Sequence, residues 1–335
     1  MVVKKQVSLK NHNTFGIDVQ AKYYVEVFSE TDLKNALLNN KEPIFLLGGG
    51  SNLLLRRDVE GLIIKNRIFG KRVVAEDDYE VLVEVGGGEN WHEIVLWTLD
   101  NGWSGLENLS LIPGTIGASP IQNIGAYGVE LKDVFHQLSA IDLYSLENIM
   151  FHHSDCQFGY RDSIFKRELK GKIAITKVYF RLSKIPNIQI DYGDIQAVLK
   201  DKKISHPTPK DVSNAVIQIR QSKLPDPAEL GNSGSFFKNP EIEKTHFLIL
   251  QKKFPDIAFY PLPNGQIKIP AGWLIEHSGW KGKRIGNCGS HARQALVLVN
   301  YGGATGDEIW NLALQIKESI QLKFGIEITP EVNIW

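Results

Sequence analysis

Two glycine-rich segments of this 335-residue chain contain the residues best suited to hold a phosphorylated ligand. The first runs Gly48-Gly49-Gly50-Ser51-Asn52 and follows a short apolar run. Consecutive glycines let several backbone N–H groups converge on one anion, and Ser51 and Asn52 add side-chain donors. The spacing is not that of a G-x-G-x-x-G dinucleotide motif, and a strand-like run follows instead of a helix. We expect a phosphate nest here, with a glycine-rich hairpin turn as the alternative.

The second segment, residues 113–128, places small residues at close intervals with polar donors between them. Small residues let a flat ring approach the backbone, whose N–H and C=O groups can then bind the polar edge of an isoalloxazine. A buried turn of small residues would look similar. Two such segments in one domain favour a bound, planar, phosphorylated cofactor, and its expected contacts are Gly48, Gly49, Gly50, Ser51, Asn52, Pro113, Gly114, Thr115, Gly117, Ala118, Ser119, Gln122, Asn123, Gly125, Ala126, Tyr127 and Gly128.

The elements that must position these segments mix strands and helices without strict alternation, which predicts an α+β fold. In the first half we expect strands at 23–28, 44–47, 62–65, 79–85, 138–143 and 173–182, and helices at 29–40 and 89–100. Val81, Val83 and Val85 alternate with polar residues, as in a half-buried strand. The pattern at 173–182 also alternates over most of its length.

The second half has its clearest signal at the end. Thr305 and Glu308 form a capping-box pattern, and Gly325 is placed to end the helix that they begin. Further helices are expected near 242–253 and 271–278, with strands at 295–299 and 326–335. Residues 222–239 are rich in proline and glycine and form the best candidate for a domain boundary.

Composition excludes several classes of protein. Lys plus Arg and Asp plus Glu number 38 each, so the formal net charge is zero, which disfavours a nucleic-acid binder. The two cysteines, Cys156 and Cys288, exclude a disulfide scaffold and indicate a reduced compartment. The sequence shows no secretory signal and no apolar run of bilayer length. We therefore expect a cytoplasmic protein with no membrane insertion.

Six segments in this order resemble the UDP-N-acetylenolpyruvoylglucosamine reductase family, in its longer subtype with an extra tyrosine loop. They are Asn13-Thr14-Phe15-Gly16, residues 48–52, residues 109–128, Gly159-Tyr160-Arg161-Asp162-Ser163, residues 234–240 and Pro330-Glu331-Val332. Each motif is weak alone, but the ordered set is specific and covers essentially the whole chain.

The resemblance implies a fold, a cofactor and two nucleotide partners. It implies noncovalent FAD in a two-subdomain fold of the vanillyl-alcohol-oxidase type, a C-terminal α+β substrate-binding domain, and NADPH as electron donor. The substrate would be UDP-N-acetylglucosamine enolpyruvate. The domains would be 1–68 and 69–220 for FAD and 221–325 for substrate, with 326–335 returning near the first. The chain is expected to be a monomer.

The resemblance also implies a catalytic set. Arg161 would bind the substrate carboxylate and stabilise the enolate-like charge. Ser235 would donate the proton to carbon, with Glu331, beside the substrate carboxyl, assisting through a hydrogen bond or a raised pKa. Residues expected to bind the nucleotide substrate are Tyr160, Tyr192, Lys223, Asn239 and Gln294.

Two other signals are interpreted structurally. Residues 152–156, His-His-Ser-Asp-Cys, are too closely spaced to share one tetrahedral ion, so no metal site is expected. Asn300 to Thr305 could bind phosphate, but we prefer a turn with an N-cap at Thr305. Two alternatives to the reductase remain: another flavoenzyme of the same fold, such as an oxidase, and a nucleotide-sugar-binding protein without catalysis.

Overall fold

A computed structural model describes residues 2–335, and the chain divides into two compact units. The first contains residues 2–7, 21–49 and 59–222. The second contains residues 8–20, 50–58 and 223–335, so the chain passes from the first unit to the second directly after Gly49. Each unit is described separately below.

A sheet with strand order β1-β2-β5-β3 begins the first unit. Its strands are β1 (Lys4–Ser8), β2 (Gln20–Val27), β5 (Val59–Asn66) and β3 (Ile44–Leu47). Both β2 and β3 run parallel to β5. The helix α1 (Glu30–Leu37) begins at Ser29, whose side chain accepts a hydrogen bond from the Asp32 N–H. It ends earlier than the sequence predicts, because the Asn40 side chain bonds the backbone of Glu42 in a turn.

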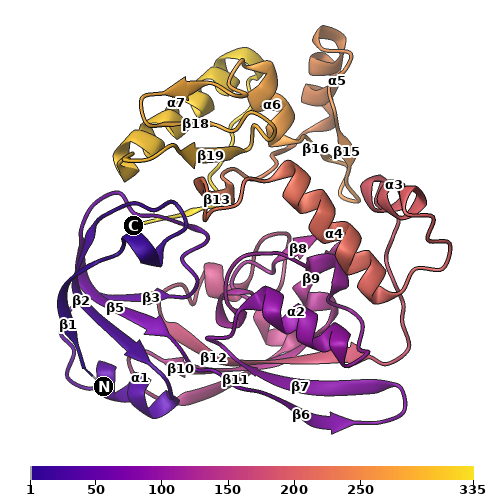
Figure 1. The fold of residues 1–335 in the computed structure, drawn as a ribbon. Coiled ribbons are helices and arrows are strands. Elements are labelled where there is room, and N and C mark those ends of the chain that lie inside the picture. The colour runs from indigo at the N-terminus through magenta and orange to yellow at the C-terminus, as the bar shows by residue number, and fades with distance from the viewer. Residues whose placement is uncertain (1) are drawn as a thin grey trace. The chain divides into compact units, whose positions relative to one another are not determined.

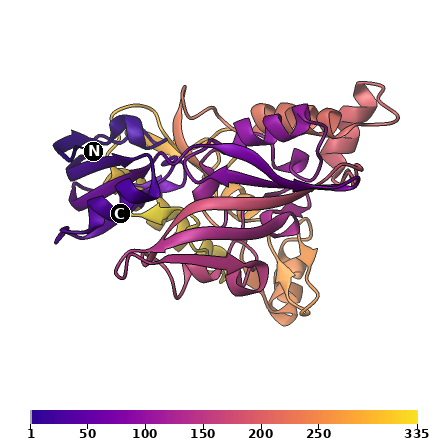
Figure 2. The same cartoon turned by 90° about the horizontal axis from the view of Figure 1, so that it is seen from below.

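A five-stranded antiparallel sheet forms the rest of this unit's framework, in the order β11-β10-β12-β7-β6. The strands are β6 (Lys71–Glu76), β7 (Glu80–Gly86), β10 (Phe135–Asp142), β11 (Asn148–His152) and β12 (Ile173–Ser183). Val81, Val83 and Val85 are fully buried, as their alternation predicts. They pack with Ile94 and Val95 of α2 (Trp91–Asp100), which covers one face of the sheet (Figure 1). Figure 2 views the strands from their other side.

The central strand β12 departs from the predicted alternation. Most of its residues are buried, including neighbours such as Ala174 and Ile175. Ala174 joins a core cluster with Leu33 and Leu62, whereas Ile175 belongs to the cluster around α2. Parts of both faces of β12 are therefore covered, because two core clusters meet this strand from opposite sides.

The first unit also contains two helices that the sequence pattern did not predict. They are α3 (Gly193–Asp201) and α4 (Pro209–Lys223). Val212, Val216 and Ile219 form the buried stripe of α4, and proline is compatible with the first turn of a helix. Two short paired strands, β8 (Gly125–Ala126) and β9 (Val129–Glu130), lie between α2 and β10 in sequence.

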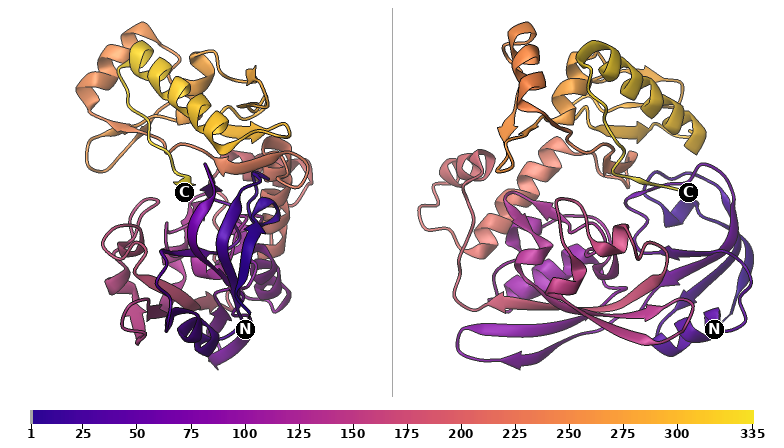
Figure 3. Two further views of the ribbon diagram at one scale, coloured as in Figure 1. Left: turned by 90° about the vertical axis from the view of Figure 1, so that its left-hand side faces the viewer. Right: turned by 180° about the vertical axis from the view of Figure 1, so that it is seen from behind.

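The second unit is built on the antiparallel sheet β13-β19-β18-β17. Its strands are β13 (Gly231–Ser235), β17 (Arg284–Ile285), β18 (Cys288–Ser290) and β19 (Val297–Asn300). The long helix α7 (Gly306–Phe324) packs against β18 and β19, as Figure 3 shows. The predicted capping box of Thr305 and Glu308 is confirmed, and Gly325 ends the helix in the left-handed conformation.

The remaining elements of the second unit are short. They are α5 (Lys244–Lys253), α6 (Ala271–His277), and the three-stranded sheet of β14 (Glu241–Ile242), β16 (Ile267–Lys268) and β15 (Tyr260–Pro261). The expected strand at 326–335 is limited to β20 (Asn333–Ile334), which runs parallel to β4 (Leu53–Leu54). The two cysteines are buried and free. No helix among residues 2–335 has the length and apolar character to cross a membrane.

Candidate functional site

The two glycine-rich segments, separate in sequence, come into contact within the first unit. A Cβ on Gly48 would lie 2.6 Å from Oγ1 of Thr115, and a Cβ on Gly49 would lie 2.9 Å from Cα of Gly114. Any side chain at 48 or 49 would therefore collide with the other segment. The pair forms a cradle of backbone, in which no residue of 2–335 accepts a hydrogen bond from the Gly49 N–H. A free backbone donor where two glycine-rich segments pack this closely fits a phosphorylated cofactor.

The second unit requires glycine at position 50 for a different reason. Gly50 has φ +69°, and a Cβ there would lie 2.0 Å from the carbonyl oxygen of His12. The Gly50 carbonyl accepts a hydrogen bond from the Thr14 N–H at 3.1 Å. Asn13 is buried and bonds the backbone of Leu9 and Ile17. This part of the family-like sequence therefore has a structural role.

The segment 113–128 is fixed to the end of β7 by its backbone. The Gly117 N–H donates to the Gly87 carbonyl at 2.9 Å, and the Ile116 N–H donates to Glu89. A Cβ on Gly117 would lie 3.0 Å from the carbonyl oxygen of Gly87. The small residues here thus allow close backbone packing as well as the access that a flat ring would need.

Asn123 has a positioning role. It is fully buried, and its amide donates to the Gly159 carbonyl at 3.0 Å and to Glu130 at 3.1 Å. Its Oδ1 accepts from the Lys132 N–H. The cofactor segment is in this way joined to the turn that carries Tyr160 and Arg161.

Tyr160 and Arg161 lie at the tip of a tight turn closed by two hydrogen bonds between Gly159 and Asp162. Arg161 has φ +52°, a left-handed conformation that costs a non-glycine residue free energy and occurs often at functional sites. Its Nη2 donates to the carbonyl of Gly125 at 2.5 Å, and its guanidinium lies over the ring of Tyr160. The structure therefore brings the predicted carboxylate-binding arginine to the predicted cofactor segment.

Tyr127 and Tyr192 are also brought together, with ring centroids 5.8 Å apart in an edge-to-face arrangement. Tyr192 immediately precedes α3 and is exposed, while burial raises the pKa of Tyr127. A Cβ on Gly128 would lie 3.7 Å from the ring of Tyr192. The tyrosine that the sequence assigned to substrate therefore borders the segment assigned to the cofactor.

Sequence reasoning missed Arg220, on the last turns of α4. Its Nε is buried without a hydrogen-bond partner among the residues described. Burial lowers the pKa of Arg220, and the nearby positive charge of Arg161 lowers it further, whereas Tyr127 opposes the shift. A buried donor beside these residues is a candidate contact for the cofactor or the substrate carboxylate. No motif in the sequence marks Arg220, and its burial is visible only in the fold.

Within the second unit, Ser235 and Glu331 lie on neighbouring segments. The Glu331 N–H donates to the carbonyl of Phe236 at 2.8 Å, and Phe237 forms a bridge with Pro330. Ser235 is exposed, whereas Phe236 and Phe237 are buried and anchor the strand. The backbone pairing thus places Glu331 opposite Phe236, one residue along from the predicted proton donor.

The other predicted substrate residues of this unit have defined surroundings. Asn239 accepts a hydrogen bond from the Ala271 N–H at 2.9 Å through Oδ1, which leaves its amide N–H₂ as a donor. Gln294 lies beside α6, the helix that begins at Ala271, and its Oε1 is 3.3 Å from where a Cβ on Gly272 would be. Lys223 is the last residue of α4. Asn52 contacts the backbone of Glu331 and Asn333.

The histidine-containing segment 152–156 is structural. The Asp155 carboxylate accepts a hydrogen bond from the His152 N–H at 2.8 Å, and Cys156 is buried. Within residues 2–335 no group of three or more His, Cys, Asp or Glu side chains could hold a metal ion.

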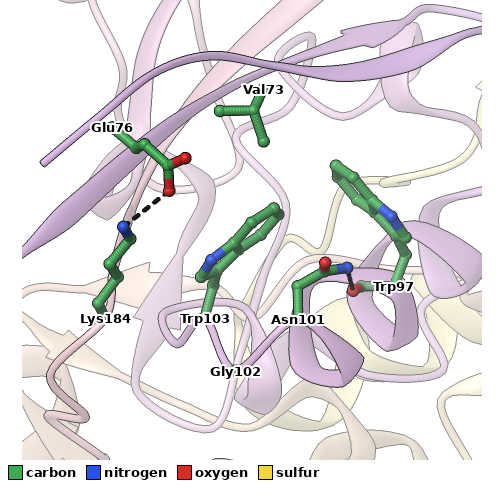
Figure 4. Close-up of a pocket in the computed structure, with 7 residues that line it drawn as sticks. All are labelled: Val73, Glu76, Trp97, Asn101, Gly102, Trp103 and Lys184. Carbon is green, nitrogen blue, oxygen red and sulfur yellow. Dashed lines mark hydrogen bonds and ion pairs between the residues drawn. The ribbon is translucent and has the colours of Figure 1, made fainter.

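A cavity of about 600 Å³ lies at the C-terminal end of α2 (Figure 4). Its walls include the indoles of Trp97 and Trp103, which meet edge to face at 5.2 Å, and an ion pair of Lys184 with Glu76 at 2.7 Å. None of the predicted site residues lines it.

Comparison with known proteins first defines the class. A family model described as FAD binding domain matches residues 21–144, which contain both glycine-rich segments in full. Together with the relatives below, this match makes the chain an FAD-containing oxidoreductase. The predicted α+β fold with an FAD-binding part and a C-terminal domain is confirmed, since a model for the UDP-N-acetylenolpyruvoylglucosamine reductase C-terminal domain matches residues 226–335.

Whole-length relatives then define the family. A Flavobacterium johnsoniae protein named UDP-N-acetylenolpyruvoylglucosamine reductase is 53% identical over 336 residues, covering 100% of both chains. A Pseudomonas aeruginosa protein of the same name is 48% identical and covers 99% of both. The chain belongs to the UDP-N-acetylenolpyruvoylglucosamine reductase family. A solved reductase of Thermus caldophilus shares the fold, with a TM-score of 0.69 at 22% identity, covering 100% of this chain and 99% of that one.

Proposed function

We propose that the chain reduces UDP-N-acetylglucosamine enolpyruvate to UDP-N-acetylmuramate, with electrons from NADPH and bound FAD, in the synthesis of peptidoglycan precursors. The observation that carries this proposal is the full-length relationship to reductases at 53% identity. The contact between the two glycine-rich segments, with Arg161 bonded to one of them, supports it independently.

The cofactor, when bound, supplies hydride transfer. In the first unit, residues of the two glycine-rich segments would hold it, with Gly49 offering a free backbone donor. Arg161 would bind the substrate carboxylate through its planar guanidinium and stabilise negative charge that develops beside the reduced carbon. The left-handed turn and the Gly125 contact hold the guanidinium in place for this task.

The second unit would supply the proton. Ser235 would donate its hydroxyl proton to the substrate carbon, and Glu331, on the neighbouring segment, would in its protonated form donate a hydrogen bond to the substrate carboxylate. Asn239, Gln294 and Lys223, with Tyr160 and Tyr192, would bind the sugar nucleotide. Intact Arg161, Ser235 and Glu331 argue against a binding protein without catalysis.

The proposal also includes the oligomeric state, the location and the domain boundaries of the chain. The chain would act as a monomer in the cytoplasm. Residues 1–68 and 69–220 would form the two FAD subdomains and 221–325 the substrate domain, with 326–335 returning to the first subdomain.

Product analysis tests the proposal. Purified protein with NADPH and UDP-N-acetylglucosamine enolpyruvate should yield a product heavier by two hydrogens, in a one-to-one ratio with NADPH consumed. NADPH consumption that is independent of the enolpyruvyl substrate, with oxygen as the acceptor, would contradict it and favour the oxidase alternative.

A further inference from the structure

A buried lysine lies beneath the first glycine-rich segment. Lys65 is in β5, the strand that pairs with β3, and only 8% of its surface is exposed. Its Nζ donates a hydrogen bond to the carbonyl of Gly48. Lysine is rarely buried unless it is paired, so its position at this loop calls for a role.

No carboxylate among residues 2–335 forms an ion pair with Lys65. The charges that act on Lys65 are Arg67, which directly follows β5, and Glu26 on β2. Glu26 itself pairs with Arg67 at 3.6 Å and accepts from the Tyr24 hydroxyl at 2.9 Å. Burial lowers the pKa of Lys65 to about 8, Arg67 adds to this effect, and Glu26 opposes it. Since the pKa stays near 8, the ammonium is the main form at neutral pH.

The geometry of the peptide bond links this lysine to the free donor. The Gly48–Gly49 peptide is trans, because the chain has no cis bonds. In a trans peptide the C=O and the N–H point in opposite directions. The bond from Lys65 to the Gly48 carbonyl therefore directs the Gly49 N–H away from Lys65. That N–H has no acceptor in the part of the chain described.

We propose that Lys65 is a positioning residue for the cofactor: it orients the Gly48–Gly49 peptide so that the Gly49 N–H binds a phosphate of FAD. Its ammonium also supplies positive charge behind that peptide. The net charge of the chain is zero, so an anion depends on such local charges. This inference rests on the proposed function only in taking FAD as the ligand.

The affinity for FAD tests it without any measurement of activity. Apoprotein would be titrated with FAD, and the dissociation constant followed by flavin fluorescence, for wild type, Lys65→Met and Lys65→Arg. Lys210→Met is the matched control, since Lys210 is exposed and pairs with Asp100 on the surface. We expect Lys65→Met to bind FAD about tenfold more weakly or worse at pH 7, and the control to match wild type.

A pH series makes the test sharper. Wild-type affinity should fall as pH rises through about 8, where Lys65 loses its charge. Lys65→Arg should stay flat from pH 7 to 9.5, because arginine keeps its charge. The comparison of wild type with Lys65→Arg also tests the role of Lys65 if Lys65→Met does not fold.

Equal FAD affinity in folded Lys65→Met and wild type would overturn the inference, as would the same pH slope in wild type and Lys65→Arg. If wild type binds no FAD at all, the proposed function fails instead.

Discussion

Arg161 is the residue that we expect to bind the substrate carboxylate. It occupies a left-handed turn, contacts the cofactor segment through Gly125, and stands near the buried Arg220. A lysine at this position would keep the charge but could not form two parallel hydrogen bonds with a carboxylate. The property to test is therefore whether Arg161 binds a carboxylate through two parallel hydrogen bonds.

Arg161→Lys should slow the oxidation of reduced flavin by the enolpyruvyl substrate at least tenfold, because carboxylate binding in the transition state is weakened. Reduction of the flavin by NADPH should change little. Stopped-flow absorbance separates the two half-reactions. Arg181→Lys is the control, since Arg181 pairs with Glu80 on the surface of the sheet. Normal turnover in Arg161→Lys would remove this arginine from the site.

Ser235→Ala should also leave reduction by NADPH nearly intact and slow reoxidation by substrate by roughly 100-fold or more, as expected for loss of a general acid. Ser154→Ala, at an exposed serine of the turn after β11, should match wild type. If both half-reactions of Ser235→Ala slow together, the serine is not the proton donor.

At the scale of elements, the loops determine the site more than the strands do. Gly16 and Gly50 have nearly the same left-handed backbone, φ +67° and +69°, but only Gly50 is crowded. Gly16→Ala should cost about 1 kcal/mol of unfolding free energy from backbone strain alone. Gly50→Ala should cost about 3 kcal/mol or more, since its Cβ would overlap the carbonyl of His12. Chemical denaturation of the apoproteins measures both, and equal losses would show that steric crowding does not explain Gly50.

Elements with a strong local pattern could be predicted from the sequence. The buried valines of β7, the cap at Ser29 and the capping box of α7 all follow from local spacing. The coverage of both faces of β12 could not, because it depends on which clusters pack against the strand. The contact of Gly48 and Gly49 with Thr115 and Gly114 was likewise hidden, since it joins segments far apart in the chain.

The candidate site shows the same limit. Ser235 and Glu331 could be proposed from family motifs, but only strand pairing shows that they lie on adjacent segments. Arg220 and Lys65 carry no motif. Their significance comes from burial and from hydrogen bonds made or left unmade, which no local pattern in the sequence predicts.

For the whole molecule, FAD should behave as a ligand that stabilises the folded state. A ligand at 100 times its dissociation constant adds about 2.7 kcal/mol of unfolding free energy. The apoprotein should therefore melt several degrees lower than the protein with FAD, in differential scanning calorimetry. Adenosine, which has neither phosphate nor flavin ring, should produce no comparable shift. An unchanged melting temperature with FAD would count against the cradle as its site.

The central claim is that one flavin accepts electrons from NADPH and passes them to the enolpyruvyl ether. Its most direct test is the visible spectrum of the purified protein under anaerobic conditions, with NADPH added first and UDP-N-acetylglucosamine enolpyruvate second. We predict that the yellow colour bleaches with NADPH and returns in full with the substrate. Bleaching without return would contradict the reductase and favour an oxidase, and a protein that stays colourless even with added FAD would contradict the flavin site itself.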